Sequence, residues 1–140
     1  MKNFADKLMK AVREKGNPIC VGLDPRLDKI PDFIKRKVLD EEDLTPTKAA
    51  AEALLAFNKG IIDAVYDIVP VVKPQIAFYE IFGADGVFAY QETLKYAKSK
   101  GLITIADAKR NDIGSTAEAY AQAFLGEMAL FEGEDEVVMP

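Results

Sequence analysis

The chain has 140 residues, close to the roughly 150 of a typical single domain. Hydrophobic residues make up 49% of it and charged residues 29%, a composition that favours a folded globular domain over disorder. The net charge of -5 argues against binding to nucleic acids or anionic membranes, since both need an excess of lysine and arginine on one face. We therefore expect one soluble domain with no nucleic-acid or membrane partner.

Two residue types limit the chemistry. Histidine is absent, which excludes histidine metal ligands and histidine general bases, and the single cysteine, Cys20, has no second cysteine for an internal disulfide. Residues 1–15 mix charged with apolar side chains, unlike the core of a signal peptide. No apolar run approaches the roughly 18 to 20 residues of a membrane span. These features predict a cytoplasmic protein.

Helical spacing of apolar side chains over residues 1–15 predicts a first helix, with Asn3 as its N-cap and Gly16 as its C-terminal stop. A strand comes next. Residues 25–46 then hold three prolines and many charges, which indicates an insertion with one short helix near 32–38.

Short apolar runs predict three strands: residues 18–23, 68–72 and 102–106. The helix between the first two begins at Thr45 and Pro46, a favourable N-cap and first helical position. The helix between the last two ends at Gly101, which suits a left-handed C-cap. A last helix opens with a capping box formed by Ser115 and Glu118.

This alternation predicts an α/β fold with a parallel sheet. The second predicted strand starts 34 residues before the third. That spacing is close to the roughly 31 residues per unit of a TIM (β/α)8 barrel of about 250 residues. We therefore expect residues 1–140 to form part of a single barrel domain, its first three to four β/α units. Residues 127–140 are expected to be an acidic tail that could end in the stub of a fourth strand at 137–140.

Charged residues follow each predicted strand at its carboxyl end. They are Asp24 after the first strand, Lys73 after the second, and Asp107, Lys109 and Asp112 after the third. Open α/β sheets and TIM barrels place their active sites at this edge, because the loops converge there. If the third strand stays extended, Asp107 and Lys109 share one face, about 6.5 to 7 Å apart.

A purely structural interpretation is open for these residues. The DxKxxD pattern after the third strand also fits a solvated loop with incidental ion pairs, and Asp24 also fits an Asx turn. Lys73 favours the functional interpretation, because a second lysine on the neighbouring strand allows alternating charges in one pocket. Cys20 is expected to be a small buried hydrophobic residue.

Four sequence blocks resemble the orotidine 5'-phosphate decarboxylase family, specifically its longer subfamily with an insertion after the first strand. They are ICVGLDPR at 19–26, FNKGIIDA at 57–64, VVKPQIAFYEIFG at 71–83 and TIADAKRNDIGSTAEAY at 104–120. The last block, a DxKxxDI signature followed by a threonine, is the most specific. The resemblance extends to about residue 125 and implies a TIM-barrel homodimer.

The resemblance implies decarboxylation of orotidine monophosphate to UMP, in de novo pyrimidine biosynthesis, without a metal or another cofactor. Lys109 would be the proton donor, and Asp107 would lie beside the departing carboxylate and hold Lys109. Lys73 would hold Asp107 and a ribose hydroxyl, and Asp24 would also accept from the ribose. Gln75 would be a polar substrate-binding residue with a less defined role.

By the same resemblance, three residues would reach the site of the neighbouring subunit: Asp112, Ile113 and Thr116. Dimerisation would then be a condition of activity. The loops that grip the substrate phosphate follow strands seven and eight of such barrels, so we expect the chain alone to be weakly active or inactive.

Two rival functions stay open. One is a magnesium-dependent relative, a hexulose-phosphate synthase or ketogulonate-phosphate decarboxylase. Magnesium prefers carboxylate oxygens, however, and Lys73 places a cation at the end of the second strand, where that site would want an acidic ligand. The other is a non-catalytic half-barrel in which the charges only cap the strands.

Overall fold

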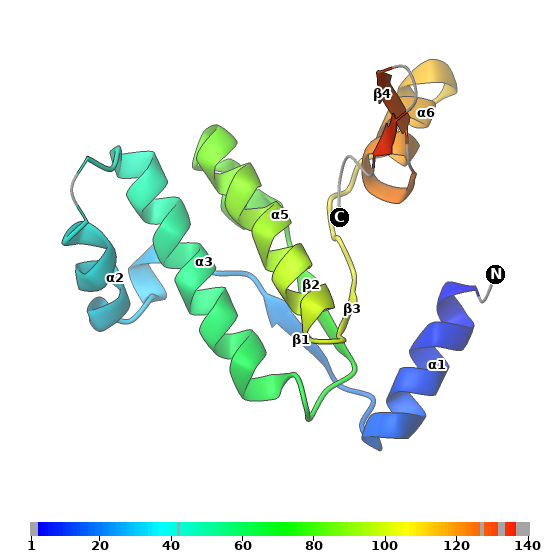
Figure 1. Ribbon diagram of the computed structural model, residues 1–140, viewed down its shortest axis with the longest axis horizontal. Coiled ribbons are helices and arrows are strands. Elements are labelled where there is room, and N and C mark those ends of the chain that lie inside the picture. Colours follow the sequence, from blue (N-terminus) through cyan, green and yellow to red (C-terminus); the bar gives the residue numbers. More distant parts are fainter. Residues whose placement is uncertain (1–2, 42, 127, 132–133, 137–140) are drawn as a thin grey trace. The chain divides into compact units, whose positions relative to one another are not determined.

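The computed structural model describes residues 3–41, 43–126, 128–131 and 134–136. The chain divides into two compact units, Met1–Asp107 and Ala108–Pro140. The first unit contains a parallel sheet with covering helices, and the second contains a helix and a pair of strands (Figure 1). None of the helices in the described ranges combines the length and the apolarity that crossing a bilayer requires.

The first helix, α1 (Phe4–Lys15), forms as predicted. The Asn3 side chain accepts a hydrogen bond from the backbone N–H of Asp6 at 2.8 Å, which satisfies one donor of the first turn. Gly16 ends the helix in the left-handed conformation, with φ of 61°, which glycine adopts without steric cost. The predicted N-cap and stop are both confirmed.

Three parallel strands form the sheet of the first unit in the order β1-β2-β3. They are β1 (Cys20–Leu23), β2 (Val71–Pro74) and β3 (Ile103–Thr104). Each neighbouring pair is parallel, with Cys20 opposite Val71 and Val71 opposite Ile103. The predicted alternation of strands and helices around a parallel sheet is therefore confirmed.

The second strand starts later than predicted, and Lys73 lies inside it instead of after it. The backbone N–H groups of Ile68 and Val69 donate to the carbonyl of Val65 at 2.9 and 3.0 Å and complete the last turn of the preceding helix. Pro70 has no N–H to contribute to a sheet ladder. The apolar run is thus divided between a helix end and a strand.

The segment between β1 and β2 contains the predicted insertion and a long helix. The insertion holds a short 3-10 helix, η1 (Leu27–Lys29), and α2 (Asp32–Leu39). The long helix, α3 (Pro46–Val65), begins where predicted, because the Thr45 hydroxyl accepts from the backbone N–H of Lys48 at 3.3 Å.

Two helices lie between β2 and β3. The first, α4 (Ala77–Glu80), is a single turn that the sequence did not predict, and α5 (Gly83–Ser99) follows it. A Cβ added to Gly86 would lie 1.8 Å from the carbonyl oxygen of Tyr79, so the two helices approach closely only because this position is glycine.

One face of the sheet packs against α3 and α5, which lie side by side (Figure 1). The buried residues of this core come from the sheet, its flanks and both helices: Leu23, Ile62, Val69, Val72, Ala97 and Leu102. Burying each of the larger side chains contributes about 1.5 to 3 kcal/mol relative to leaving it exposed. The core therefore fixes the strands whose ends carry the predicted site.

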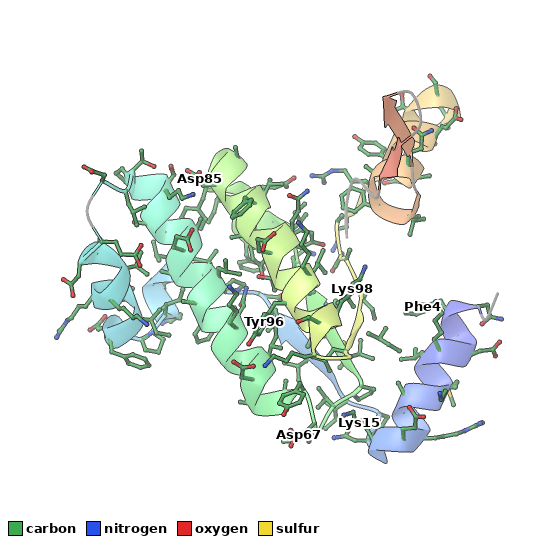
Figure 2. All side chains as sticks on the ribbon, in the orientation of Figure 1. Phe4, Lys15, Asp67, Asp85, Tyr96 and Lys98 are labelled. Carbon is green, nitrogen blue, oxygen red and sulfur yellow. The ribbon has the colours of Figure 1, made fainter. Side chains whose placement is uncertain are left out.

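An ion pair joins the last turn of α3 to the end of α5, at the amino ends of the strands. Lys100 Nζ lies 2.6 Å from Asp63 Oδ1, and the Tyr96 hydroxyl lies 2.8 and 2.9 Å from the two oxygens of the same carboxylate. The ammonium also lies over the rings of Tyr66 and Tyr96. Figure 2 shows Tyr96 between the two helices.

These contacts change the titration of both charged groups. Hydrogen bonds from Lys100 and then from Tyr96 lower the pKa of Asp63 below its ordinary value. Hydrogen bonds with Asp63 and Tyr96 raise the pKa of Lys100 above its ordinary value. Each charged form is thus favoured in the folded protein, so the cluster contributes to stability.

The second unit begins its regular structure with α6 (Gly114–Leu125). The predicted capping box is wrong, because Ile113 occupies the N-cap position and Ser115 lies inside the first turn. No side chain caps the helix, and Gly114 has a left-handed φ of 57° at its start. The spacing of Ser115 and Glu118 therefore did not predict that the helix begins at Gly114.

The expected acidic tail contains a pair of strands. β4 (Met128–Phe131) and β5 (Glu134–Glu136) are antiparallel to each other and form a separate two-stranded sheet. Residues 137–140, where the stub of a fourth strand was expected, lie outside the described residues.

Candidate active site

The strand register brings four predicted site residues to one face of the sheet. Gly22 pairs with Lys73, and Gln75 forms a bridge with Asp107. Because side chains alternate along a strand, Lys73 and Gln75 share a face, and the bridge adds Asp107 to it. The Asp24 carboxylate is on the same side, 3.6 Å from where a Cβ on Gly22 would stand. We call this the site face.

Cys20 also lies on the site face, two residues before Gly22, and it is exposed. This corrects the expectation that it is buried, because the alternation along β1 turns Cys20 to the site face while Leu23 of the same strand faces the core. Partial burial raises the pKa of the thiol, and the nearby Lys73 ammonium opposes that shift. The electrostatic effect agrees with the strand register, which places both side chains on one face.

Lys73 and Asp107 form an ion pair on the site face. Lys73 Nζ lies 3.4 Å from Asp107 Oδ2, and the two side chains are 36% and 24% exposed. The backbone N–H of Asp107 donates to the Pro74 carbonyl at 3.2 Å, and the Asp107 carbonyl accepts from the N–H of Ile76 at 3.1 Å. The sheet ladder thus fixes the Asp107 backbone, while both charged groups stay partly accessible.

Gln75 and Asp24 lie at the rim of the site face. Gln75 Oε1 accepts from the backbone N–H of Ala77 at 3.2 Å, where the chain turns into α4. Asp24 is exposed and directly follows β1. The loops after these two residues enclose a hollow of about 490 Å³, lined by residues 25–28 and by side chains between 77 and 82. The carboxyl ends of β1 and β2 therefore open onto a largely apolar depression.

Lys109 belongs to the second unit and has a left-handed φ of 49°. The expected extended alternation from Asp107 to Lys109 is therefore wrong, since a left-handed residue interrupts the period of two. Residues with a Cβ adopt this conformation uncommonly, and such strained positions cluster at functional sites. The neighbouring Arg110 donates through Nη1 to the Ala108 carbonyl at 2.8 Å.

The three residues expected to reach a neighbouring subunit lie at the start of α6. Asp112 Oδ1 accepts from the backbone N–H of Ile113 at 2.8 Å. The Ile113 side chain is 85% exposed, and Thr116 is exposed in the first turn. All three side chains are accessible to a partner from this short segment.

Comparison with known proteins identifies the family. Residues 17–131 match the model of the family described as "Orotidine 5'-phosphate decarboxylase / HUMPS family". The chain belongs to this family. The orotidine 5'-phosphate decarboxylase of Petrotoga mobilis is 47% identical over 132 residues, which cover 94% of this chain and 40% of the relative. That of Clostridium tetani is 46% identical over 131 residues, with 94% and 40% covered.

Solved structures of orotidine 5'-phosphate decarboxylases show the same architecture. The Leishmania donovani enzyme is 30% identical, with a TM-score of 0.63, and covers 89% of this chain and 40% of its own. The Plasmodium berghei enzyme has a TM-score of 0.73 over 86% of this chain and 48% of its own, and at 24% identity it supports the fold alone. The expected α/β fold of the TIM-barrel type is confirmed. The chain spans about 40% of the length of the curated relatives it matches.

Sequence reasoning missed Asn58 and Tyr79, two fully buried polar residues behind the end of β1. Asn58 follows Leu54 and precedes Ile62 at intervals of four, so it lies on the apolar stripe of α3. A polar residue on such a stripe was the available signal. Tyr79 lies in α4, the turn that the sequence did not predict.

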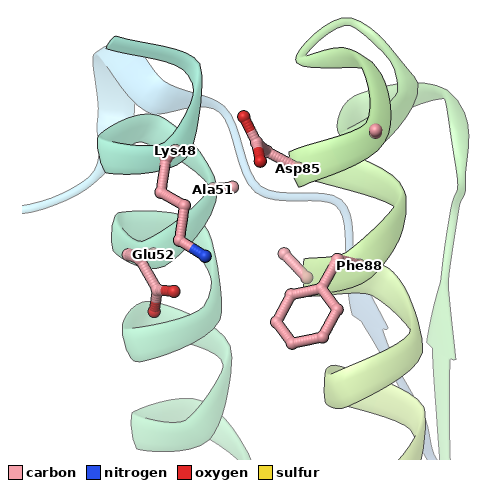
Figure 3. Close-up of a pocket in the computed structure, with 7 residues that line it drawn as sticks. Lys48, Ala51, Glu52, Asp85 and Phe88 are labelled. Atoms are coloured by element: carbon pink, nitrogen blue, oxygen red, sulfur yellow. The ribbon is translucent and has the colours of Figure 1, made fainter. Parts of the chain in front are cut away.

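A separate pocket of about 310 Å³ lies between the first halves of α3 and α5 (Figure 3). Lys48, Asp85 and Phe88 are among its lining residues, and the Lys48 ammonium lies 5.6 Å from the centre of the Phe88 ring. The pocket contains none of the predicted site residues. Within the described ranges, no group of three or more histidine, cysteine, aspartate or glutamate residues is placed to hold a metal ion.

Proposed function

We propose that the chain supplies the carboxyl-end catalytic residues of an enzyme that decarboxylates orotidine 5'-phosphate to UMP. The observation that carries the proposal is the Lys73–Asp107 pair, which shares the site face with Asp24 and Gln75. A cation and two carboxylates on adjoining strand ends suit a ribose and a reacting carboxylate. The names of the curated relatives supply the substrate.

Lys109 acts as the proton donor in the proposed reaction. The bond between C6 of the pyrimidine and its carboxylate carbon breaks, carbon dioxide leaves, and the electron pair remains on C6. The Lys109 ammonium stabilises this negative charge and transfers a proton to C6. The resulting amine regains its proton from water. The proposed reaction has no step that uses a metal or another cofactor.

The remaining residues position the donor and the ribose. Asp107, whose carboxylate is opposite in charge to the lysine ammonium, would hold Lys109 in place. Lys73 holds Asp107 and a ribose hydroxyl, which its ammonium can donate to. Asp24 accepts from a second ribose hydroxyl, and Gln75 contributes a polar contact at the rim of the site.

A second copy of the chain completes the proposed site. Asp112, Ile113 and Thr116 would extend into the site of the partner, which makes the enzyme a homodimer. Their exposure at the start of α6 supports this arrangement. The proposed enzyme works in pyrimidine biosynthesis in the cytoplasm.

The phosphate of the substrate is held by another part of the barrel. TIM barrels build their phosphate sites from the loops after strands seven and eight, and remote binding energy of this kind assists the reacting end. The 140 residues by themselves should therefore turn over orotidine 5'-phosphate weakly or not at all.

A chimera tests the proposal directly. Residues 17–131 of this chain, the segment that matches the family, replace the corresponding segment of the Petrotoga mobilis relative, whose remaining part completes the barrel. We expect the chimera to convert orotidine 5'-phosphate to UMP. Lys109→Ala should lower kcat by at least about 10³-fold, because it removes both the proton donor and the charge opposite C6.

Circular dichroism and size-exclusion chromatography provide the folding control for this test. The matched control is Lys98→Ala, which removes an exposed lysine of α5 (Figure 2) and should leave kcat within about twofold. A folded Lys109→Ala protein with near-normal turnover would contradict the assigned role. Orotidine 5'-phosphate left unchanged by a folded, dimeric chimera would contradict the proposed function itself.

A further inference from the structure

Three helices converge on the end of β1 through a buried polar network. Asn58 of α3, Tyr79 of α4 and Thr93 of α5 are all 0% exposed. The Tyr79 hydroxyl donates to the carbonyl of Leu23 at 3.0 Å. Leu23 is the last residue of β1, and Asp24 of the site face follows it. The network therefore ends at the peptide bond that carries a predicted substrate-binding residue.

The hydrogen bonds of this network have only one consistent direction. Thr93 Oγ1 donates to the Ala89 carbonyl at 2.8 Å, and the Tyr79 hydroxyl already donates to Leu23. Each hydroxyl has a single proton, so both must accept from Asn58. Asn58 Nδ2 lies 2.9 Å from the Tyr79 oxygen and 3.1 Å from Thr93 Oγ1. The amide thus aims the Tyr79 hydroxyl at Leu23.

Stability alone does not account for this arrangement. Within the described residues, Asn58 Oδ1 is buried without a hydrogen-bond partner. A buried polar atom of this kind is costly, and apolar residues of similar shape would avoid the cost. The network instead gives a fixed direction at one carbonyl. Such a fixed hydrogen-bond direction is useful if the Leu23 carbonyl has to be held in one orientation.

The Tyr79 ring is itself held in place. It packs edge to face against the Tyr90 ring, with centroids 5.2 Å apart. Burial raises the pKa of Tyr79, which keeps its hydroxyl protonated and able to donate to Leu23. A planar peptide bond links the Leu23 carbonyl to the backbone of Asp24. Fixing the carbonyl therefore also fixes the start of the Asp24 residue.

We propose that Tyr79, aimed by Asn58, is a positioning residue that sets the Leu23–Asp24 peptide plane and so places the Asp24 carboxylate for the ribose of the substrate. This inference rests on the proposed function. Tyr79 lies behind the sheet and acts only through Asp24. Its removal should therefore affect the reaction only while the Asp24 carboxylate is present.

A double-mutant cycle in the chimera tests this dependence. The variants are Tyr79→Phe, Asp24→Ala and the combination, and the readout is kcat/KM for orotidine 5'-phosphate. Tyr79→Phe keeps the ring and its packing. It should lower kcat/KM about tenfold in the parent, a loss typical of one misplaced hydrogen bond, and less than about twofold in the Asp24→Ala background. Melting temperatures of all four proteins report the structural effect separately.

Tyr96→Phe is the matched control, because Tyr96 donates to Asp63 at the opposite end of the strands. It should lower the melting temperature and leave kcat/KM unchanged in both backgrounds. Equal losses from Tyr79→Phe in the two backgrounds, or no loss in either, would overturn the inference while leaving the proposed function intact. A folded parent chimera without turnover would overturn the proposed function and this inference with it.

Discussion

The first unit holds one lysine–aspartate pair at each end of its parallel sheet. At the amino ends, Lys100 and Asp63 are 2.6 Å apart, and the Tyr96 hydroxyl adds hydrogen bonds to the same carboxylate. At the carboxyl ends, Lys73 and Asp107 are 3.4 Å apart on the site face. The two pairs have the same chemistry but different lengths and surroundings.

This difference indicates what each pair does. The 2.6 Å contact of Lys100 with Asp63 is supported by two tyrosines: the ammonium lies over the rings of Tyr66 and Tyr96, and the Tyr96 hydroxyl also donates to Asp63. The 3.4 Å contact of Lys73 exceeds the usual range of about 2.7 to 3.2 Å, so it adds little to stability. In TIM barrels the amino end serves stability and the carboxyl end serves catalysis. We therefore expect the Lys100–Asp63 pair to contribute to stability and the Lys73–Asp107 pair to contribute to activity.

Replacing Lys73 or Lys100 with alanine tests whether one pair serves activity and the other stability. Of the changes that follow from this comparison, the loss of activity in Lys73→Ala is expected to be the largest. In the chimera, Lys73→Ala should lower kcat/KM by about 10²-fold or more, since it removes a charged donor to Asp107 and the ribose. Its melting temperature should change little. Lys100→Ala should do the reverse, with a lower melting temperature and kcat/KM within about twofold of the parent.

Steady-state kinetics and thermal circular dichroism measure both effects on the same samples. Lys98→Ala serves again as the control for removing a lysine from the surface of α5. Equal losses of activity in the Lys73 and Lys100 variants would show that the two ends do not differ in function.

The sequence predicts the convergence of charges at the carboxyl ends for a simple reason. Asp24, Lys73 and Asp107 all follow the apolar runs that predict the strands, and parallel strands end at one edge. Local signals were equally sufficient for the caps at Asn3 and Thr45, because each cap depends on residues within one turn. Features of this kind need no knowledge of distant contacts.

Other features depend on contacts that the sequence does not display. The start of β2 depends on Val65, whose carbonyl accepts from the first residues of the apolar run. Asp63 and Lys100 belong to different helices and meet only in the folded protein. The left-handed backbone of Lys109 has no glycine or asparagine to signal it, and the open face around Cys20 depends on the arrangement of the strands.

A pH series tests the stabilising role of the amino-end pair, with a smaller expected effect. The folded pKa of Asp63 is lowered, so the carboxylate stabilises the protein above its ordinary pKa of 3.8. This contribution should disappear as the pH falls below that value and through the lowered pKa. The melting temperature of Asp63→Asn should therefore be below that of the parent at pH 7, and the difference should vanish in acid.

Thermal circular dichroism of the chimera from about pH 7 down to about pH 2.5 measures this difference. The exposed Asp67 lies four residues from Asp63, and Asp67→Asn provides the matched control, which should track the parent across the series. A constant difference between Asp63→Asn and the parent would show that the carboxylate charge contributes nothing. The raised pKa of Lys100 adds a second pH range to test. The contribution of the Lys100 charge to stability is lost only as the pH rises above 10.5.

Chelation should have the smallest effect, and it tests what the carboxyl-end pair does with its charges. EDTA should leave kcat and the melting temperature of the chimera unchanged, because the Lys73 ammonium already neutralises Asp107 and repels a divalent cation from the end of β2. A loss of turnover that Mg²⁺ restores would favour the magnesium-dependent alternative. Asp107 would then be a metal ligand, and Lys73→Ala should strengthen the dependence on Mg²⁺ instead of removing activity. The two experiments together therefore separate a charge-paired site from a metal site.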